Sequence, residues 1–311
     1  MKVKLISELL ENYKKTTAPR NPKKIIFHGF TGFDYYNPTA PFFYENKTLI
    51  VARVEKRDSE VSRSIFFEKK DDQYYPCSEI SEFALQDPFI TKIHGKYVFG
   101  GTKTYFNSNN EFVWRTDFYS GEKLENLEHF FSGPERMKDV RLAELKDGSI
   151  AVFSRPQGKI GLRGKIGFTI VHSLDELSVP LIENAPLLDT FDNLEWGGVN
   201  EVHILKNGLI GILGHIAKFT EGDVRHYYPM AFVIDPVTHN YSDLEILATR
   251  SEFLPGPAKR SDLVDVLFSG GLIRNDDLSA SLYVGVSDAE VQSIEIIDPF
   301  VKYENNQILW K

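Results

Sequence analysis

The sequence predicts an all-β chain folded as a five-bladed β-propeller with a short N-terminal helix. A hairpin layout recurs at intervals of roughly 50 to 70 residues, and a period of this length is typical of repeat architectures. Each copy has two β-prone runs joined by a turn, such as Asp147-Gly148 or Asn207-Gly208. Each copy opens on Asn or Asp, and most close on Arg, His or Asp. The copies open at Asn37, Asp87, Asp139, Asn200 and Asp262 or Asp265.

The matching polar ends favour a propeller over an unrelated set of hairpins. Asp-Gly and Asn-Gly turns occur in any all-β protein and indicate only hairpins. In a hairpin with strands of similar length, the start of the first strand and the end of the second lie together. The innermost strand of each blade lines the central channel, so these polar ends converge at one mouth. The predicted cup contains Asn37, Asp87, Asp139, Asn200 and Asp265 from strand starts, and Arg53, Arg155, His215 and Asp288 from strand ends.

The segment before the first hairpin is predicted to hold a helix, a strand and a loop. Apolar residues between Val3 and Lys15 follow a helical period, and prolines end the pattern, so residues 1–22 form a short helix and lead-in. Its polar face is mixed in charge, which favours packing on the outside of the barrel over a membrane anchor. Lys23–Phe27 is a strand. The glycine-rich, aromatic loop Gly29–Phe33 could wrap a ligand, but no helix follows it as a phosphate-cradling loop requires.

The later segments supply outer strands and connections. Residues 55–76 contain two strands joined by charged turns, and Glu111–Phe118 is a further strand that contains Arg115. The polar stretch Lys218–Tyr228 follows His215, and it is either a lid over the cup or a solvated surface loop. Ile294–Trp310 has two strand-like runs, enough to close the ring with the N-terminal strand.

Composition indicates an ordinary soluble protein. The 311 residues are 42% hydrophobic and 26% charged, and an all-β repeat of this length fits one catalytic domain over residues 1–311. A formal charge of −8 argues against a nucleic-acid surface, and there is no apolar run long enough to span a bilayer. The single cysteine, Cys77, excludes an intramolecular disulfide, and the N-terminus lacks a secretory pattern. We therefore expect a cytoplasmic protein that binds neither nucleic acid nor membrane.

The predicted cup mixes acids with bases, and this mixture indicates a sugar together with a phosphate. Carboxylates and amides hydrogen-bond to sugar hydroxyls, whereas Arg, Lys and His neutralise phosphate through charge-assisted hydrogen bonds. Asp87, the one carboxylate of the stretch Ala84–Gly101, is the candidate catalytic acid. Each polar residue could instead form a salt bridge between blades, so the cluster is stronger evidence than any single member.

Seven short motifs between about Asn37 and Phe300 carry a family resemblance. The chain resembles glycoside hydrolase family 130, the five-bladed β-mannoside phosphorylases. It is more closely similar to glycosyltransferase family 108, the β-1,2-mannosyltransferase and phosphorylase group long described as a domain of unknown function. Ser154 stands where the family has His before its Arg-Pro pair. The motifs are Asn37-Pro38, Arg53-Val54-Glu55, Gln86-Asp87-Pro88, Lys138-Asp139, Ser154-Arg155-Pro156, Gly214-His215 and Tyr283–Asp288.

The resemblance implies roles for individual residues. Asp87 matches the family's proton donor, which protonates the glycosidic oxygen. Four positions match phosphate ligands, and five are expected to bind the sugar. The predicted phosphate ligands are Arg53, Arg115, Lys138 and His215, and the predicted substrate-binding residues are Asn37, Asp139, Arg155, Asn200 and Asp288.

The implied reaction is an inverting displacement that gives α-mannose 1-phosphate from a β-1,2-linked mannoside, or the reverse synthesis onto a mannose or oligomannoside acceptor. An inverting hydrolase needs a second carboxylate to activate water, but phosphate is already an anionic nucleophile. We expect inorganic phosphate as co-substrate, with no other cofactor and no metal. The alternatives are an inverting β-mannosidase, a sugar-nucleotide-dependent mannosyltransferase and a non-catalytic carbohydrate-binding propeller. The basic character of Lys138 and His215 favours phosphorolysis over hydrolysis.

Overall fold

The computed structural model describes residues 3–305 and 310, and this part of the chain consists mainly of β-strands. Its α-helices are short: α1 (Ile6–Tyr13), α2 (Gly158–Gly161), α3 (Val179–Glu183) and α4 (Val301–Glu304). The prediction of an all-β chain with a short N-terminal helix is confirmed. None of the described helices is long and apolar enough to cross a bilayer.

The strands of the described residues form four hydrogen-bonded sheets. The first holds β2 (Ile26–Phe27), β3 (Phe33–Tyr36), β4 (Phe42–Tyr44), β5 (Lys47–Lys56), β6 (Ser62–Lys70) and β7 (Gln73–Pro76). The second holds β8 (Gln86–Ile93), β9 (Lys96–Phe106), β10 (Phe112–Gly121) and β11 (Glu128–Ser132). The third holds β12 (Arg141–Glu144), β13 (Ile150–Ser154), β14 (Ile166–Val171) and β15 (Leu187–Leu188).

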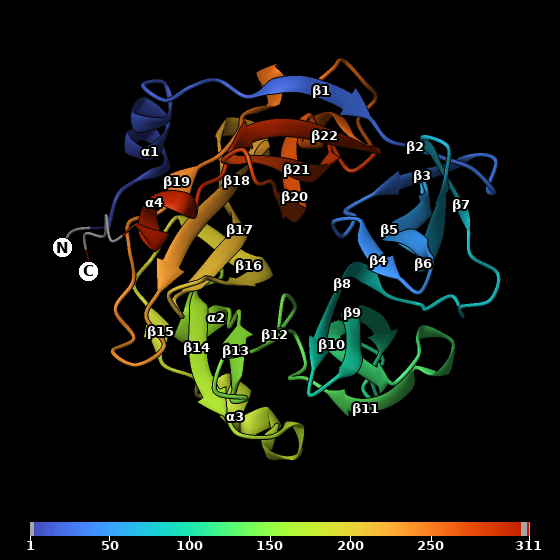
Figure 1. Ribbon diagram of the computed structural model, residues 1–311, viewed down its shortest axis with the longest axis horizontal. Helices are drawn as coiled ribbons and strands as arrows, with labels where there is room; N and C mark the ends of the chain where they lie inside the picture. Colours follow the sequence, from blue (N-terminus) through green and yellow to red (C-terminus); the bar gives the residue numbers. More distant parts are fainter. Residues whose placement is uncertain (1–2, 306–309, 311) are drawn as a thin grey trace.

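The fourth sheet consists of two antiparallel units. One holds β16 (Glu195–Ile204), β17 (Ile210–Phe219), β18 (Arg225–Ile234) and β19 (Glu245–Ile246), and the other holds β20 (Asp265–Arg274), β21 (Ser279–Val286), β22 (Glu290–Ile297) and β1 (Arg20–Lys24). They join only where β18 pairs in parallel with β20, through His226 with Asp265 and Tyr227 with Val266. In Figure 1 the resulting five units of the described chain surround a common centre, with β8, β12, β16 and β20 on the inner side.

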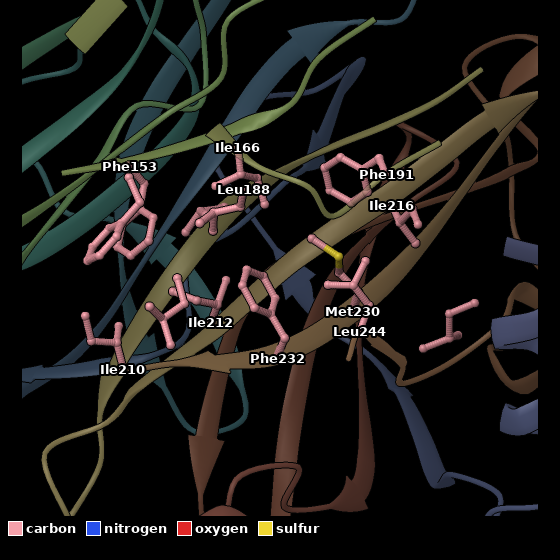
Figure 2. Close-up of a cluster of buried hydrophobic side chains, with 14 of the residues drawn as sticks. Phe153, Ile166, Leu188, Phe191, Ile210, Ile212, Ile216, Met230, Phe232 and Leu244 are labelled. Atoms are coloured by element: carbon pink, nitrogen blue, oxygen red, sulfur yellow. The ribbon is translucent and has the colours of Figure 1, made fainter. Parts of the chain in front are cut away.

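Hydrophobic cores lie between neighbouring units. The buried apolar side chains of the described residues form five clusters. Four of them combine residues of two adjacent units, and the fifth lies on the first sheet, where the partly buried Tyr283 of β21 packs against it. Figure 2 shows one of them, in which Phe153 and Leu188 of the third sheet face Met230 and Phe232 of the next unit. Burying one Phe or Leu side chain contributes about 1.5–3 kcal/mol, so these interfaces hold the ring together.

The central strands contact a core on each face, and this explains their unbroken apolar runs. In β5, Leu49 and Val51 belong to the cluster shared with the second sheet. Ile50, Ala52 and Val54 belong to the cluster on the opposite face. Because side chains alternate along a strand, a strand buried on both faces is apolar throughout.

The inner edge of four of the five units is interrupted near a polar or small residue. The pairing of β8 with β9 shifts between Gln86 and Phe89, and that of β16 with β17 shifts between Val199 and Glu201. A bulge of this kind redirects a side chain out of the ladder. The backbone is left-handed at two of the interruptions, at Asn37 (φ 44°) and Asp87 (φ 51°), and also at Asp139 (φ 59°), which lies just before β12. The bulges therefore turn polar side chains out of the ladder at similar positions around the ring.

Three expectations about the elements are corrected. Asn200 lies inside β16 rather than at its start, and the fifth interruption is at Ser269–Gly271 of β20 rather than at Asp265. The stretch 218–228 is the tip of the β17–β18 hairpin, with a short 3₁₀ turn between the strands, and not a separate lid. Of the two strand-like runs expected in Ile294–Trp310, the first is the end of β22, and α4 follows it; most of the second lies outside the described residues, although Trp310 forms an antiparallel bridge with Ser242. The ring closes where β22 pairs with β1.

Candidate active site

Most of the predicted site residues line one cavity of about 190 Å³, here called the cup. Asp87, Asp139 and Asp288 bring carboxyl groups, and Arg53 and Lys138 bring positive charges. Residues that the sequence analysis did not select also line it. The predicted residues in the cup are Asn37, Arg53, Asp87, Lys138, Asp139, His215 and Asp288, and the additional polar ones are Glu60, Gln86, Arg225, Tyr227, Lys259 and Arg260.

Asp87 is a buried carboxylate with two donors on one oxygen. Its Oδ1 accepts hydrogen bonds from Asn37 Nδ2 at 2.7 Å and from Arg53 Nη1 at 3.3 Å, and the residue is 3% exposed. Burial alone raises the pKa of Asp87, but the positive charges of Arg53 and Lys138 outweigh it and hold the pKa below its usual value. In the unliganded protein Asp87 is therefore ionised at neutral pH.

The guanidinium of Arg53 binds two carboxylates, Asp87 in the cup and Glu55 beside it. Besides Asp87 it binds Glu55, with Nη2 2.7 Å from Oε2, and its Cζ lies 4.8 Å from the centre of the Tyr36 ring. Glu55 is buried and also accepts a hydrogen bond from Lys259, whose Nζ lies 3.0 Å from Glu60 Oε1. Neither Glu55 nor Lys259 is among the predicted site residues, although Glu55 follows Arg53 by two residues in one of the family motifs.

Asp139 forms the second buried acid-base pair of the cup. Arg155 Nη1 donates to Asp139 Oδ2 at 2.7 Å, while Asp139 Oδ1 has no hydrogen-bond partner among the described residues. Burial raises the pKa of Asp139, but the charges of Arg155 and Lys138 overcome this and lower it far below the usual value. Asp139 is thus a permanent anion with one buried acceptor oxygen left for a ligand.

His215 is a neutral ring held by an amide. Its Nδ1 lies 2.9 Å from Asn200 Oδ1, which also accepts from Ser269 Oγ at 3.2 Å. Burial lowers the pKa of His215 to about 3, so the ring is uncharged at neutral pH. Since an amide oxygen only accepts, Nδ1 carries the proton and Nε2 is an acceptor. A neutral His215 can meet phosphate only through hydrogen bonds and not through charge, and its role as a phosphate ligand stays a prediction.

Lys138 and Asp288 are the unpaired members of the cup. Neither side chain has a hydrogen bond or ion pair within the part of the chain that the structure describes. Burial raises the pKa of Asp288 above its usual value, and the charge of Arg53 only partly opposes this. The cup thus combines a free ammonium, an ionised Asp87 and a carboxyl group that retains its proton more readily.

A larger cavity of about 470 Å³ adjoins the cup. The two cavities share Glu60, Gln86, Lys138, Arg225 and Tyr227, so Lys138 lies at their junction. Aromatic rings dominate the remaining wall of this second cavity, together with Arg155 and Arg163. The rings are Phe112, Trp114, Trp196 and Phe219. The stretch 218–228 supplies Phe219, Arg225 and Tyr227 to this cavity, and the predicted ligands Lys138 and Arg155 also line it, but its other aromatic rings had no sequence signal.

Four expected members lie outside the cup, and one of them, Arg155, lines the second cavity instead. Arg115 Nε donates to Asp117 at 2.7 Å, its guanidinium lies over Tyr105, and it lines neither cavity. Asp265 accepts hydrogen bonds from His226 and Tyr228 instead of facing the cup. Asn200 lies behind His215 and lines a separate cavity on the other side of the bulges.

The assembled groups can bind an anion and transfer a proton. Lys138 and Arg53 supply charge for an anion, and Asp87 is a carboxylate whose charge depends on how Arg53 is shared. Among the described residues no group of three or more His, Cys, Asp or Glu side chains is arranged to hold a metal ion.

Comparison with known proteins supports a common family. A model of the family described as "protein of unknown function (DUF1861)" matches residues 11–302, whereas no curated protein matches. A mannose phosphorylase from Leishmania mexicana, solved with phosphate, is 35% identical with a TM-score of 0.89, and the match covers 96% of this chain and 94% of the other. A GDP-mannose-dependent mannosyltransferase from the same organism is 32% identical with a TM-score of 0.86, covering 98% and 97%.

More distant structures share the fold. A β-1,2-mannobiose phosphorylase from Listeria innocua is 16% identical with a TM-score of 0.63, and the match covers 88% of this chain and 93% of that one. The relation to mannoside phosphorylases and mannosyltransferases inferred from the seven motifs is confirmed. The chain belongs to the DUF1861 family.

Proposed function

We propose that this protein catalyses the inverting phosphorolysis of β-1,2-linked mannosides and the reverse synthesis, transferring mannose between α-mannose 1-phosphate and a mannose or oligomannoside acceptor. The observation that carries the proposal is Lys138, an ammonium with no partner among the described residues, at the junction of the cup and the second cavity. The two Leishmania relatives, a mannose phosphorylase and a mannosyltransferase, support mannose as the transferred sugar.

Asp87 acts as the general acid, and phosphate prepares it for this role. In the free protein Arg53 and Lys138 keep Asp87 ionised. A phosphate ion that enters the cup brings negative charge and competes for Arg53, so the pKa of Asp87 rises as phosphate binds. Asp87 then takes up a proton that it can donate. This coupling ties acid catalysis to the presence of the nucleophile.

The proposed displacement needs no second catalytic carboxylate, because phosphate itself is the nucleophile. A phosphate oxygen attacks the anomeric carbon from the face opposite the leaving group. The bond from that carbon to the glycosidic oxygen breaks, and this oxygen keeps the electron pair and receives the proton of Asp87. The neutral His215 accepts a hydrogen bond from a protonated phosphate oxygen, and Asn37, Asp139 and Asp288 hold sugar hydroxyls.

The second cavity accommodates the acceptor side of the substrate. Its aromatic rings Trp114, Trp196 and Phe219 offer flat apolar faces on which the C–H faces of sugars pack. Arg155 lines this cavity while it binds Asp139 of the cup, so it lies between the two parts of the substrate.

We infer that the five antiparallel units are the blades of one five-bladed β-propeller, with residues 1–311 as a single catalytic domain. The inter-unit cores and the pairing of β1 with β22 support this interpretation. The central channel of such a propeller is the place where inner-strand bulges bring polar groups together.

One alternative donor has support from the site. Transfer of mannose from GDP-mannose would use the second cavity, where Arg163 and Arg225 lie beside the ring of Phe219. Guanidinium groups bind pyrophosphate, and aromatic rings stack with a nucleobase.

Incubation of the purified protein with β-1,2-mannobiose, with and without phosphate, tests the proposal. Phosphorolysis predicts α-mannose 1-phosphate only when phosphate is present, as ³¹P NMR can detect. Release of free mannose alone at the same rate without phosphate would identify a hydrolase. Elongation of mannobiose with GDP-mannose, and none with mannose 1-phosphate, would identify a sugar-nucleotide-dependent transferase.

A further inference from the structure

Arg141 is the largest of the fully buried side chains in the described chain, yet the reaction proposed above does not use it. It is the first residue of β12 and follows Asp139 by two residues. It lines neither the cup nor the second cavity. Instead it borders a separate cavity of about 190 Å³ on the other side of the bulges, together with Phe89 and Asn200.

The guanidinium of Arg141 joins the inner strands of three units. Its Nη2 donates to the main-chain oxygen of Asp87 at 3.3 Å, its Nη1 to that of Val140 at 3.1 Å, and its Nε to that of Asn200 at 3.1 Å. Its Cζ lies 4.7 Å from the centre of the Phe89 ring. Nη2 also lies 3.8 Å from Asp139 Oδ1. A buried charge is costly unless it is paired and hydrogen-bonded, and here Asp139 and backbone carbonyls at two of the bulges supply that compensation.

The backbone of Asp87 needs a support that the local sequence does not supply. Asp87 has φ 51°, in the left-handed region that few residues other than glycine adopt. Pro88 follows it, and a proline favours extended backbone in the residue before it. Tertiary contacts must therefore hold this conformation, and the hydrogen bond from Arg141 to the Asp87 carbonyl is one of them.

We propose that Arg141 is a positioning residue: from behind the cup it holds the main chain of Asp87 in its left-handed conformation and so aims the Asp87 carboxyl group at the substrate. The catalytic part of this inference rests on the proposed function, whereas the structural part stands without it. The planar guanidinium of Arg141 donates in fixed directions to three backbone carbonyls, and a lysine ammonium cannot reproduce that geometry.

The kinetic test compares R141A and R141K with the wild type in phosphorolysis of β-1,2-mannobiose. A small displacement of a catalytic group costs about a hundredfold in rate, so R141A should lower kcat by about that factor. The KM values for phosphate and mannobiose should stay within about threefold, because Arg141 contacts neither substrate. Added guanidinium should restore kcat of R141A through the cavity that Arg141 borders, and it should not restore R141K, whose side chain occupies the space.

A matched control is R274A, which removes a half-buried arginine that binds Asp298 and Glu304 away from the cup. It should lower the melting temperature as R141A does but leave kcat unchanged. Folded R141A and R141K with kcat within about threefold of the wild type would overturn the proposal. An equal kcat loss in R274A would also overturn it.

Crystal structures of R141A and R141K supply a readout that does not depend on the reaction. The proposal predicts that Asp87 leaves the left-handed region or that its carboxyl group turns away from Asn37. An unchanged Asp87 main chain and side chain in both variants would overturn it. If the wild type transfers no mannose to any acceptor, the proposed function fails, and these structures alone decide the role of Arg141.

Discussion

Replacing Lys138 by alanine tests which charge recruits phosphate to the cup. Lys138 is half-buried at the junction of the two cavities, and it has no ion-pair partner in the described part of the chain. Asp87 and Asp139 keep their own partners, Arg53 and Arg155, when Lys138 is removed. K138A should therefore fold normally and bind phosphate weakly.

The magnitude follows from the loss of one charge-assisted hydrogen bond. A hydrogen bond to a charged group contributes about 1.5–3 kcal/mol, and 1.4 kcal/mol corresponds to a tenfold change in affinity. Part of the Lys138 side chain faces solvent, and screening reduces the effect toward the lower half of that range. We expect the KM for phosphate to rise about 10- to 40-fold, with a much smaller change in the KM for the mannoside.

Steady-state kinetics with phosphate varied at saturating β-1,2-mannobiose measures this change. Arg115 provides the matched control, since the sequence predicts it as a phosphate ligand and the structure places it in an ion pair with Asp117 outside both cavities. R115A should keep the wild-type KM for phosphate. An unchanged phosphate KM in K138A, or an equal rise in R115A, would refute the assignment of Lys138.

The remaining predictions concern the acids and the histidine. D87N should lower kcat by about 100- to 10,000-fold with an unchanged melting curve. If D87N retains more than about a tenth of the activity, another residue is the general acid, and Asp139 is the next candidate. D139N leaves Arg155 buried and unpaired, and urea unfolding should show a loss of about 3–5 kcal/mol. The pKa of Asp139 is lowered in the folded state, so ionised Asp139 stabilises the fold above the usual aspartate pKa, and this stabilisation is lost as pH falls toward the folded-state pKa. In D139N the free energy of unfolding should therefore depend less on pH in this acid range. The pKa of His215 is about 3, so the ring does not titrate between about pH 5 and 8. The pH-rate profiles of H215N and the wild type should therefore run parallel in this range. An inflection seen only in the wild type would contradict a neutral ring.

The parts of the fold that were predictable carry a local signal. Asn and Asp tolerate left-handed backbone, so Asn37 and Asp87 mark interruptions of inner strands, Asp139 marks the approach to β12, and all three are polar residues of the cup. The fifth unit lacks this signal because its interruption begins at Ser269, four residues after Asp265, the candidate carboxylate in β20. Spacing alone therefore selected Asp265, which binds His226 instead.

The second cavity was not predictable because its walls come from different units. Trp114 belongs to β10, Trp196 to β16 and Phe219 to β17, and each lies in a strand whose own pattern suggests only packing. Lys259 reaches Glu55 from a loop about 200 residues further along the chain. Such groupings depend on how the units are arranged around the centre, and no local pattern contains that information.

The pairing of β1 with β22 determines how the ring is completed during folding. Arg20 pairs with Glu295 across 275 positions of the chain, and contacts of such separation form slowly because a long loop must close first. Until β1 docks, β22 has an unpaired edge that can recruit strands from other molecules. Once in place, β1 is itself the outermost strand, and it carries Pro22 with the basic residues Arg20, Lys23 and Lys24. Proline and positive charge discourage further strand addition, so the segment that completes the ring also protects the finished molecule from aggregation.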